Sequence, residues 1–198
     1  MDSLLFENLE NPTNRANQLD SLMNHEIRVL AITVNEKQKE NVELVPVQAI
    51  AGYAQNFTDI NFIGSLPKLS IPKLREGTYR AFEIKGLSML PINEGSIVIG
   101  KFVTSFHEFQ NNKRYILVIR DLGVTFKKVV SDSKSTDRVI LVSDNTEYLP
   151  FSIAIMDILE MWEMVANIGF GNNVMDYNTL LMQKIDNIEQ RMSQMIKT

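Results

Sequence analysis

The sequence predicts a mainly β fold followed by one amphipathic helix, and three observations support this interpretation. Short β-branched or apolar runs recur between residues 26 and 168, and their lengths are those of strands. Polar clusters such as Asn93-Glu94-Gly95 and Ser131-Asp132-Ser133 separate these runs, which is typical of turns in a β-barrel or β-sandwich. After residue 173 the apolar residues change to a heptad spacing, which indicates a helix.

Composition excludes several classes of function. The chain has 198 residues, and its 20 basic and 24 acidic side chains give a formal net charge of −4, which argues against a basic nucleic-acid-binding surface. Without cysteine there are no disulfides, cysteine-based zinc sites or cysteine nucleophiles. The two histidines, His25 and His107, are far apart, which argues against a histidine-dependent triad or metal site. We therefore expect neither a metal nor a cofactor.

The N-terminal residues lack the pattern of a signal peptide, and no apolar run reaches the ~18–20 residues of a membrane span. We expect a soluble, cytoplasmic protein. Residues 1–25 are polar and rich in Asn and Asp. They are too few for a helix-turn-helix domain, which takes about three helices, so we interpret them as a leader or linker.

Residues 26–56 form a predicted hairpin arm. Apolar runs at 27–34 and 42–47 flank a polar turn at 35–41, which is the pattern of a β-hairpin. Pro46 has no backbone N–H, so we expect the second run at a sheet edge or in an extended arm.

Residues 57–168 form the predicted β domain. Tyr115–Ile119 is a continuous apolar run, which is typical of a strand buried on both faces. A short strand at Ile97–Ile99 is expected to end at Gly100. Residues 156–165 fit a helix or a strand, and their periodicity does not decide between the two. The other expected strands are Tyr79–Ile84, Gly123–Val130 and Val139–Val142.

Residues 174–198 form the predicted C-terminal helix, with a hinge at Gly169–Asn173. Its apolar residues are spaced 4, 3, 4 and 3 apart, and Asn178 occupies one position of the same seam. This pattern fits an amphipathic helix packed on the β domain or a short coiled coil, and we favour a coiled coil that forms a homodimer. The seam residues are Leu181, Ile185, Ile188, Met192 and Met195.

A candidate nucleophile lies in the sequence Gly86-Leu87-Ser88-Met89-Leu90-Pro91, directly after a predicted strand. A serine at the end of a strand, two residues after a glycine, can present its hydroxyl beside free backbone N–H groups. Acyl transfer needs this arrangement. The alternative is that Ser88 only caps the turn.

A candidate general base lies in the strand Gly123–Val130, which contains Lys127 and Lys128. Successive side chains of a strand point to opposite faces, so only one of the two lysines can point inward. Hydrophobic alternation slightly favours Lys128. The pKa of a buried lysine must fall roughly three units from ~10.4 to make it half neutral near pH 7, at a cost of roughly 4 kcal/mol. The alternative is two solvated lysines.

A third segment, Val47–Tyr53, contains small residues on both sides of the Ala51–Gly52 bond. Small side chains let another backbone approach closely. Such a segment can lie extended in a protease cleft, and the alternative is a flexible turn after a strand.

These three elements, in this order, resemble the LexA-like self-cleaving repressor family, which includes phage repressors and UmuD-type mutagenesis proteins. The resemblance covers roughly Val42–Asn167, and Ser143-Asp144-Asn145-x-Glu147-Tyr148 is similar to the family's late segment. It implies a LexA-like, signal-peptidase-like β-clip fold in residues 57–168.

The resemblance also implies the roles of individual residues. Ser88 is then the nucleophile, and Lys127, against the alternation, takes the place of the family's lysine base. Ala51–Gly52 is the bond that the protein cuts in itself, and the backbone amides of Leu87 and Ser88 form the oxyanion hole. Two departures lie outside the chemistry: Leu87 and Ser96 stand where the family often has acidic residues.

The function implied is the effector domain of a transcriptional regulator that inactivates itself. Its implied partners are a second copy of the chain, a RecA–single-stranded DNA filament as co-protease, and DNA bound only through a helix-turn-helix domain absent from this chain. Two alternatives stay open. One is a dimerising or ligand-binding module that never cleaves. The other is a signal-peptidase-like enzyme, which the missing membrane anchor disfavours.

Overall fold

The computed structural model describes residues 31–34, 40–74 and 77–170, together with Met182, Ile185, Asp186, Ile188, Glu189 and Met192 of the C-terminal segment. The predicted leader at 1–25, the hinge beyond Phe170, and Asn178, Leu181 and Met195 lie outside the described residues.

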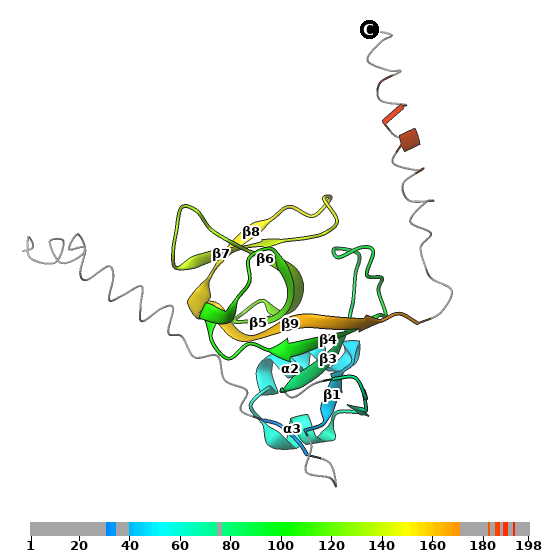
Figure 1. The fold of residues 1–198 in the computed structure, drawn as a ribbon, viewed down its shortest axis with the longest axis vertical. Helices are drawn as coiled ribbons and strands as arrows, with labels where there is room; N and C mark the ends of the chain where they lie inside the picture. The colour runs from blue at the N-terminus through cyan, green and yellow to red at the C-terminus, as the bar shows by residue number, and fades with distance from the viewer. Residues whose placement is uncertain are drawn as a thin grey trace, which may run out of the picture.

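One strongly curved sheet of nine strands dominates the described part of the chain, so the prediction of a mainly β fold is confirmed (Figure 1). The strand order is β2-β1-β3-β4-β9-β5-β6-β7-β8. The strands are β1 Val42–Val45, β2 Lys68–Leu69, β3 Tyr79–Glu83, β4 Ile97–Phe102, β5 Lys113–Ile119, β6 Gly123–Ser131, β7 Arg138–Val142, β8 Phe151–Ala154 and β9 Ile158–Ile168.

Strand β5 is buried on both faces, as its continuous apolar run predicts. Ile116 and Val118 pack into one apolar cluster with Phe82 and Trp162, whereas the alternate residues of the strand pack into a second cluster with Leu141. The two clusters lie on opposite faces of the same strand because successive side chains point in opposite directions.

The expected end of a strand at Gly100 is wrong, because β4 continues through Gly100 to Phe102. A Cβ atom at Gly100 would lie 2.5 Å from Cβ of Trp162 on the neighbouring strand. The register between β4 and β9 shifts at Ile99/Gly100. Glycine therefore marks a close approach of two strands here and not a chain turn.

The expected place of the second arm strand is also wrong. Strand β1 pairs antiparallel with β2 and parallel with β3, so it is not an edge strand. It ends at Val45, and Pro46 then begins the 3₁₀ helix η2, Val47–Ala49, where a missing N–H costs the sheet nothing. Of the predicted hairpin, the described residues contain one antiparallel bridge, Val34 to Glu40.

Periodicity left open whether residues 156–165 form a helix or a strand. In the structure, residues 158–168 form the long strand β9, which lies between β4 and β5. Its first part is buried, with Met161 and Trp162 at 0% exposure. Two further 3₁₀ helices, η3 Phe106–Glu108 and η4 Ile155–Asp157, lie between strands that follow one another in the chain, β4 and β5 and then β8 and β9.

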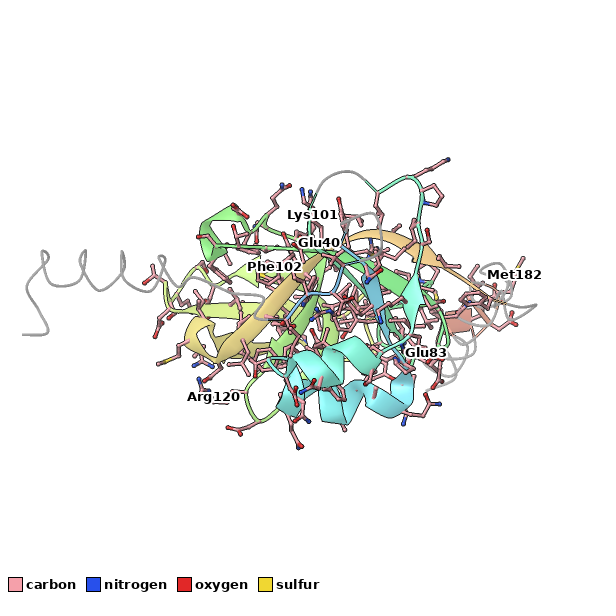
Figure 2. All side chains as sticks on the ribbon, turned by 90° about the horizontal axis from the view of Figure 1, so that it is seen from below. Glu40, Glu83, Lys101, Phe102, Arg120 and Met182 are labelled. Atoms are coloured by element: carbon pink, nitrogen blue, oxygen red, sulfur yellow. The ribbon has the colours of Figure 1, made fainter. Side chains whose placement is uncertain are left out.

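The predicted extended segment around Ala51–Gly52 is instead helical. Helix α2 spans Ile50–Asn56, and α3 spans Ile60–Ser65, where the Asp59 side chain caps the N-terminus. Figure 2 shows the two helices side by side along one side of the sheet. Tyr53 of α2 and Ile63 of α3 are both fully buried in the same apolar cluster, so tertiary packing supports these short helices.

The described residues of the C-terminal segment are helical and exposed. Met182, Ile185, Ile188 and Met192 are 41–63% exposed. Pairing of this helix with a second copy stays a prediction. Among the described residues, no helix combines the length and apolar character needed to cross a membrane.

Candidate active site

Ser88 lies in a turn that accepts two hydrogen bonds from Asn145, a residue of the loop after β7. Gly86 in this turn has φ +87°, a conformation that favours glycine. The Asn145 backbone amide donates to the Ser88 carbonyl at 3.0 Å, and Asn145 Nδ2 donates to the Leu87 carbonyl at 3.2 Å. Met89 is buried and fixes the far side of the turn in the core. The position of the Ser88 hydroxyl is therefore set by backbone contacts on one side and by packing on the other.

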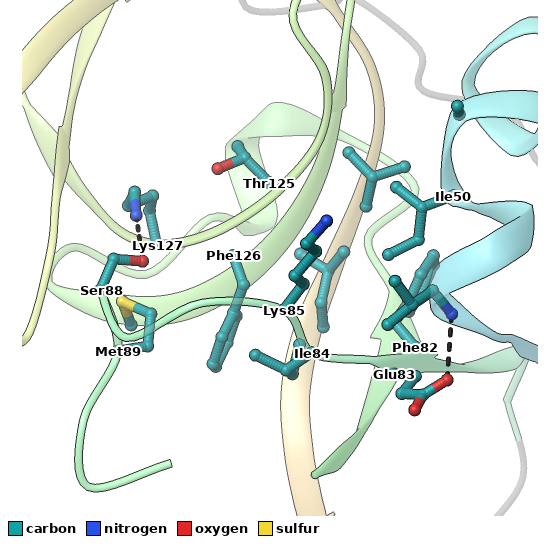
Figure 3. Close-up of a pocket in the computed structure, with 14 residues that line it drawn as sticks. Ile50, Phe82, Glu83, Ile84, Lys85, Ser88, Met89, Thr125, Phe126 and Lys127 are labelled. Carbon is teal, nitrogen blue, oxygen red and sulfur yellow. Dashed lines mark hydrogen bonds between the residues drawn. The ribbon is translucent and has the colours of Figure 1, made fainter. Parts of the chain in front are cut away.

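Lys127 of β6 points at this hydroxyl. Its Nζ donates a hydrogen bond to Ser88 Oγ at 2.6 Å, and the two residues are 39 positions apart in the chain (Figure 3). Partial burial lowers the pKa of Lys127 below its ordinary value of 10.5. Among the described residues, no carboxylate forms an ion pair with Lys127, so no opposite charge raises the pKa of Lys127 again.

Lys128 points to the other face of β6, so the lysine that contacts Ser88 is Lys127 and not Lys128, which alternation slightly favours as the buried one. Its Nζ lies 3.0 Å from Oδ1 of Asp144, and Arg114 Nε donates a hydrogen bond to the other carboxylate oxygen, Oδ2, at 2.6 Å. Arg114 lies opposite Lys128 in the β5–β6 register. This carboxylate pairs with both cations, and the Lys128 side chain is 25% exposed beside it.

The loop after β7 contributes two residues whose roles the sequence did not reveal. Asn145 holds the serine turn, and the ring centroid of Tyr148 lies 5.9 Å from Lys127 Nζ. A cation over an aromatic face is stabilised by the ring. Both lie in the segment 143–148 that resembles the family, and this resemblance was the only signal that could have drawn attention to them.

A cavity of about 380 Å³ extends from Ser88 and Lys127 to the start of α2. Ser88 and Lys127 lie at one end, Ile50 and Glu83 lie at the other, and Lys85 lies between them (Figure 3). Val47, Ile50 and Ala51 line it from the segment that carries the predicted cleavage bond. The structure thus brings Ser88, Lys127 and Ala51 to one cavity, with Ala51 in a helix and not in an extended chain.

A buried charged network lies behind α2. Arg80 is fully buried, and its two terminal nitrogens donate to Tyr53 Oη at 2.5 Å and to the Ala31 carbonyl at 2.7 Å. Carboxylate oxygens of Glu43 and Glu160 lie 3.7 Å from these nitrogens. Sequence reasoning missed this network, because its members come from five separate segments.

The charges of this network affect one another's protonation. Burial raises the pKa of Glu160, although Arg80 and two hydrogen bonds oppose the shift. Burial and the facing Glu160 raise the pKa of Tyr53 well above 10. Within the described residues, no cluster of three His, Asp or Glu side chains is arranged for a metal ion.

A mainly β domain with a serine hydroxyl against a lysine amine defines a class of candidate serine peptidases. Comparison with protein families gives the more specific assignment. Residues 44–168, more than half of the chain, match the Peptidase S24-like family. The chain therefore belongs to this family of LexA- and UmuD-type proteins. A comparison with curated proteins gave no match.

Proposed function

We propose that this chain is the effector and dimerisation domain of a transcriptional regulator, and that it inactivates itself by cutting its Ala51–Gly52 bond. One observation carries the proposal. Lys127 Nζ lies 2.6 Å from Ser88 Oγ in a cavity that Ala51 also lines. Membership of a peptidase family supports the same chemistry.

The reaction uses Lys127 as base and then as acid. Neutral Lys127 accepts the Ser88 hydroxyl proton while Ser88 Oγ attacks the Ala51 carbonyl carbon. The tetrahedral intermediate collapses, the C–N bond to Gly52 breaks, and Lys127 returns the proton to the Gly52 nitrogen. The products are an Ala51 ester of Ser88 and a free amine on Gly52. Water then hydrolyses the ester, again with Lys127 as base.

The oxyanion hole is proposed at the backbone amides of Leu87 and Ser88. Support is strongest for Ser88. In a trans peptide the C=O of one residue and the N–H of the next point in opposite directions. The hydrogen bond from Asn145 Nδ2 to the Leu87 carbonyl therefore fixes the direction of the Ser88 N–H. A donor held in advance of the reaction is what stabilises a developing oxyanion.

The proposed partners follow from this role. A second copy pairs through the C-terminal helix, whose described apolar residues are exposed. DNA is bound through a helix-turn-helix domain outside this chain. A RecA–single-stranded DNA filament favours the conformation in which the cleavage segment occupies the cavity, and it supplies no catalytic group.

The test is the intact mass of the purified chain after incubation at pH 7 and at about pH 10, beside the Ser88→Ala variant. Because burial lowers the pKa of Lys127, its neutral fraction grows with pH, and cleavage should accelerate until Lys127 is fully neutral. Fragments 1–51 and 52–198 should appear in the parent only. An unchanged, folded parent at both pH values would contradict self-cleavage.

A second candidate function has one observation in its favour. Ala51 and Gly52 lie in a helix, whereas peptidases bind the chain they cut in an extended form. A domain that keeps this helix permanently is a dimerising or ligand-binding module that never cleaves. The mass experiment separates the two functions, since such a module stays whole at both pH values.

A further inference from the structure

Two side chains fix the ends of the segment that carries the proposed scissile bond. At its start, the Val47 amide donates to Glu83 Oε2 at 3.0 Å (Figure 3). At its end, the Tyr53 hydroxyl donates to Glu160 Oε2 and accepts from Arg80, each at 2.5 Å. We call these contacts the Glu83 anchor and the Tyr53 anchor. The Ala51–Gly52 bond lies between them.

The Tyr53 anchor lies wholly inside the protein. Tyr53, Arg80 and Glu160 are each 0% exposed. Glu160 Oε2 also accepts from Trp162 Nε1 at 3.0 Å, so its position does not depend on Tyr53. The Tyr53 ring packs edge-on against Phe82 at 5.5 Å between centroids. Withdrawing Tyr53 would leave buried charged groups short of a partner, which is costly in an interior without water.

Chain length makes both anchors incompatible with an extended segment. Six residue steps separate Val47 from Tyr53. In helical form, at about 1.5–2.0 Å per residue, they span roughly 10 Å. In extended form, at about 3.3 Å per residue, they span roughly 20 Å. The segment therefore cannot extend into the cavity while both anchors hold.

We infer that the Glu83 and Tyr53 anchors keep the segment 47–53 in its helical form, and that release of an anchor limits the rate at which Ala51 reaches Ser88. The second half of this statement rests on the proposed function. Tyr53 is on this account a positioning residue that restrains the reaction. It contributes no group to the reaction itself.

The first test measures the restraint without any cleavage. Amide hydrogen exchange of α2 is followed in full-length Ser88→Ala protein, with and without Tyr53→Phe. Phenylalanine keeps the ring packing and removes only the hydroxyl contacts. Exchange of the α2 amides should rise roughly tenfold or more, because the two buried hydrogen bonds of the Tyr53 hydroxyl are lost from a locally opening unit. Unchanged exchange would overturn the inference.

Two further variants sharpen this test. Glu83→Ala removes the other anchor, lies outside the buried network, and should also raise α2 exchange. It keeps the inference testable if Tyr53→Phe does not fold. Thr33→Ala is the matched control. It removes the hydroxyl bond to Glu43 Oε1, of 2.7 Å, and Glu43 faces Nη2 of Arg80, whereas Tyr53 binds Nη1. It should leave α2 exchange unchanged, and a rise equal to that of Tyr53→Phe would overturn the inference.

The second test measures cleavage with Ser88 present. Tyr53→Phe and Glu83→Ala should both accelerate self-cleavage at about pH 10, each roughly in proportion to its rise in exchange, whereas Thr33→Ala should not. Faster exchange without faster cleavage in a parent that does cleave would overturn a rate-limiting anchor. Absence of cleavage in the parent and every variant would refute the proposed function, and the exchange data would still test the anchors.

Discussion

Two cations inside the fold, Lys127 in the cavity and Arg80 behind α2, have pKa values that are shifted in opposite directions. Arg80 is fully buried and faces two carboxylates and the Tyr53 oxygen. Burial by itself would lower the pKa of Arg80, and these neighbours raise it above its ordinary value instead. Lys127 is only half-buried, yet this burial lowers the pKa of Lys127, and its hydrogen-bond partner is a neutral hydroxyl that carries no charge to oppose the shift.

The difference shows that the partner, more than the depth of burial, decides whether a cation keeps its proton. A cation between carboxylates stabilises structure and stays charged. A half-buried cation that faces a hydroxyl and no carboxylate becomes available as a base. The four variants below test this distinction, and they run from the largest expected effect to the smallest.

Removing the amine of Lys127 should abolish the proposed reaction. Lys127→Met should slow self-cleavage by about 10³-fold or more, since a positioned general base contributes about 10²–10⁴-fold and the serine is not activated without it. Intact mass over time at about pH 10 measures the loss. A variant that still cut at the parent's rate would show that the base lies elsewhere.

The Lys127→Met variant also tests how Lys127 affects the stability of the folded protein. Because the folded pKa of Lys127 is lower than the unfolded one, the folded protein binds fewer protons between the two values. The contribution of Lys127 to stability therefore rises with pH through that window and is least favourable below it. Urea unfolding at pH 7 should show Lys127→Met to be at least as stable as the parent.

Removing the charge of Arg80 should have the opposite effect on stability. Arg80→Met leaves Glu43 and Glu160 buried without their cation, which should cost about 3–5 kcal/mol of unfolding free energy. Urea unfolding at pH 7 measures it. The control is Lys128→Met, whose pair with Asp144 is partly exposed and should change stability by less than about 1 kcal/mol. Equal losses in both variants would break the comparison.

The hydroxyl partner of Lys127 depends on Asn145 for its position. Asn145→Ala removes the side-chain bond to the Leu87 carbonyl and keeps the backbone bond to Ser88. Loss of one such bond, about 1 kcal/mol, should slow cleavage about fivefold. Asn145→Asp serves as its control, because a carboxylate cannot donate to that carbonyl and should lose as much. Full activity in both variants would remove Asn145 from the site.

The smallest effect is expected at Tyr148. Its ring stabilises the charged form of Lys127, so Tyr148→Leu should lower the pKa of Lys127 further, by less than about one unit, because an exposed cation–π contact is worth about 0.5–1 kcal/mol. The midpoint of the cleavage rate against pH should move to lower pH by the same amount. A midpoint that moved upward would mean that the ring acts through burial and not through charge.

Local patterns carried the prediction of the strands and failed where distant segments meet. Tyr115–Ile119 shows its double burial in its own composition. Gly100 was interpreted as a strand end, since the side chain of Trp162, which needs that space, lies far along the sequence. Helix α2 was missed because its support is the buried Tyr53 side chain and not a capping residue of its own.

The same holds for the candidate site, where local patterns do not show contacts between distant segments. Resemblance pointed to Ser88 and Lys127, and alternation pointed to Lys128, because alternation counts apolar neighbours and does not register the carboxylate of Asp144. No pattern in the sequence brings Arg80 to Tyr53. Their contact depends on how β1, β3 and β9 assemble, and each residue resembles an ordinary surface or core residue in isolation.

The place of β1 in the sheet has a consequence for product release. A cut after Ala51 leaves Val42–Val45 on the upstream fragment, yet this strand remains paired with β2 on one side and β3 on the other. The nicked protein is then a non-covalent complex, and separation of the two pieces requires this strand to dissociate together with the contacts of Ala31 with Arg80 and of Val47 with Glu83. Denaturing mass should detect the cut before native mass or gel filtration detects the loss of the fragment.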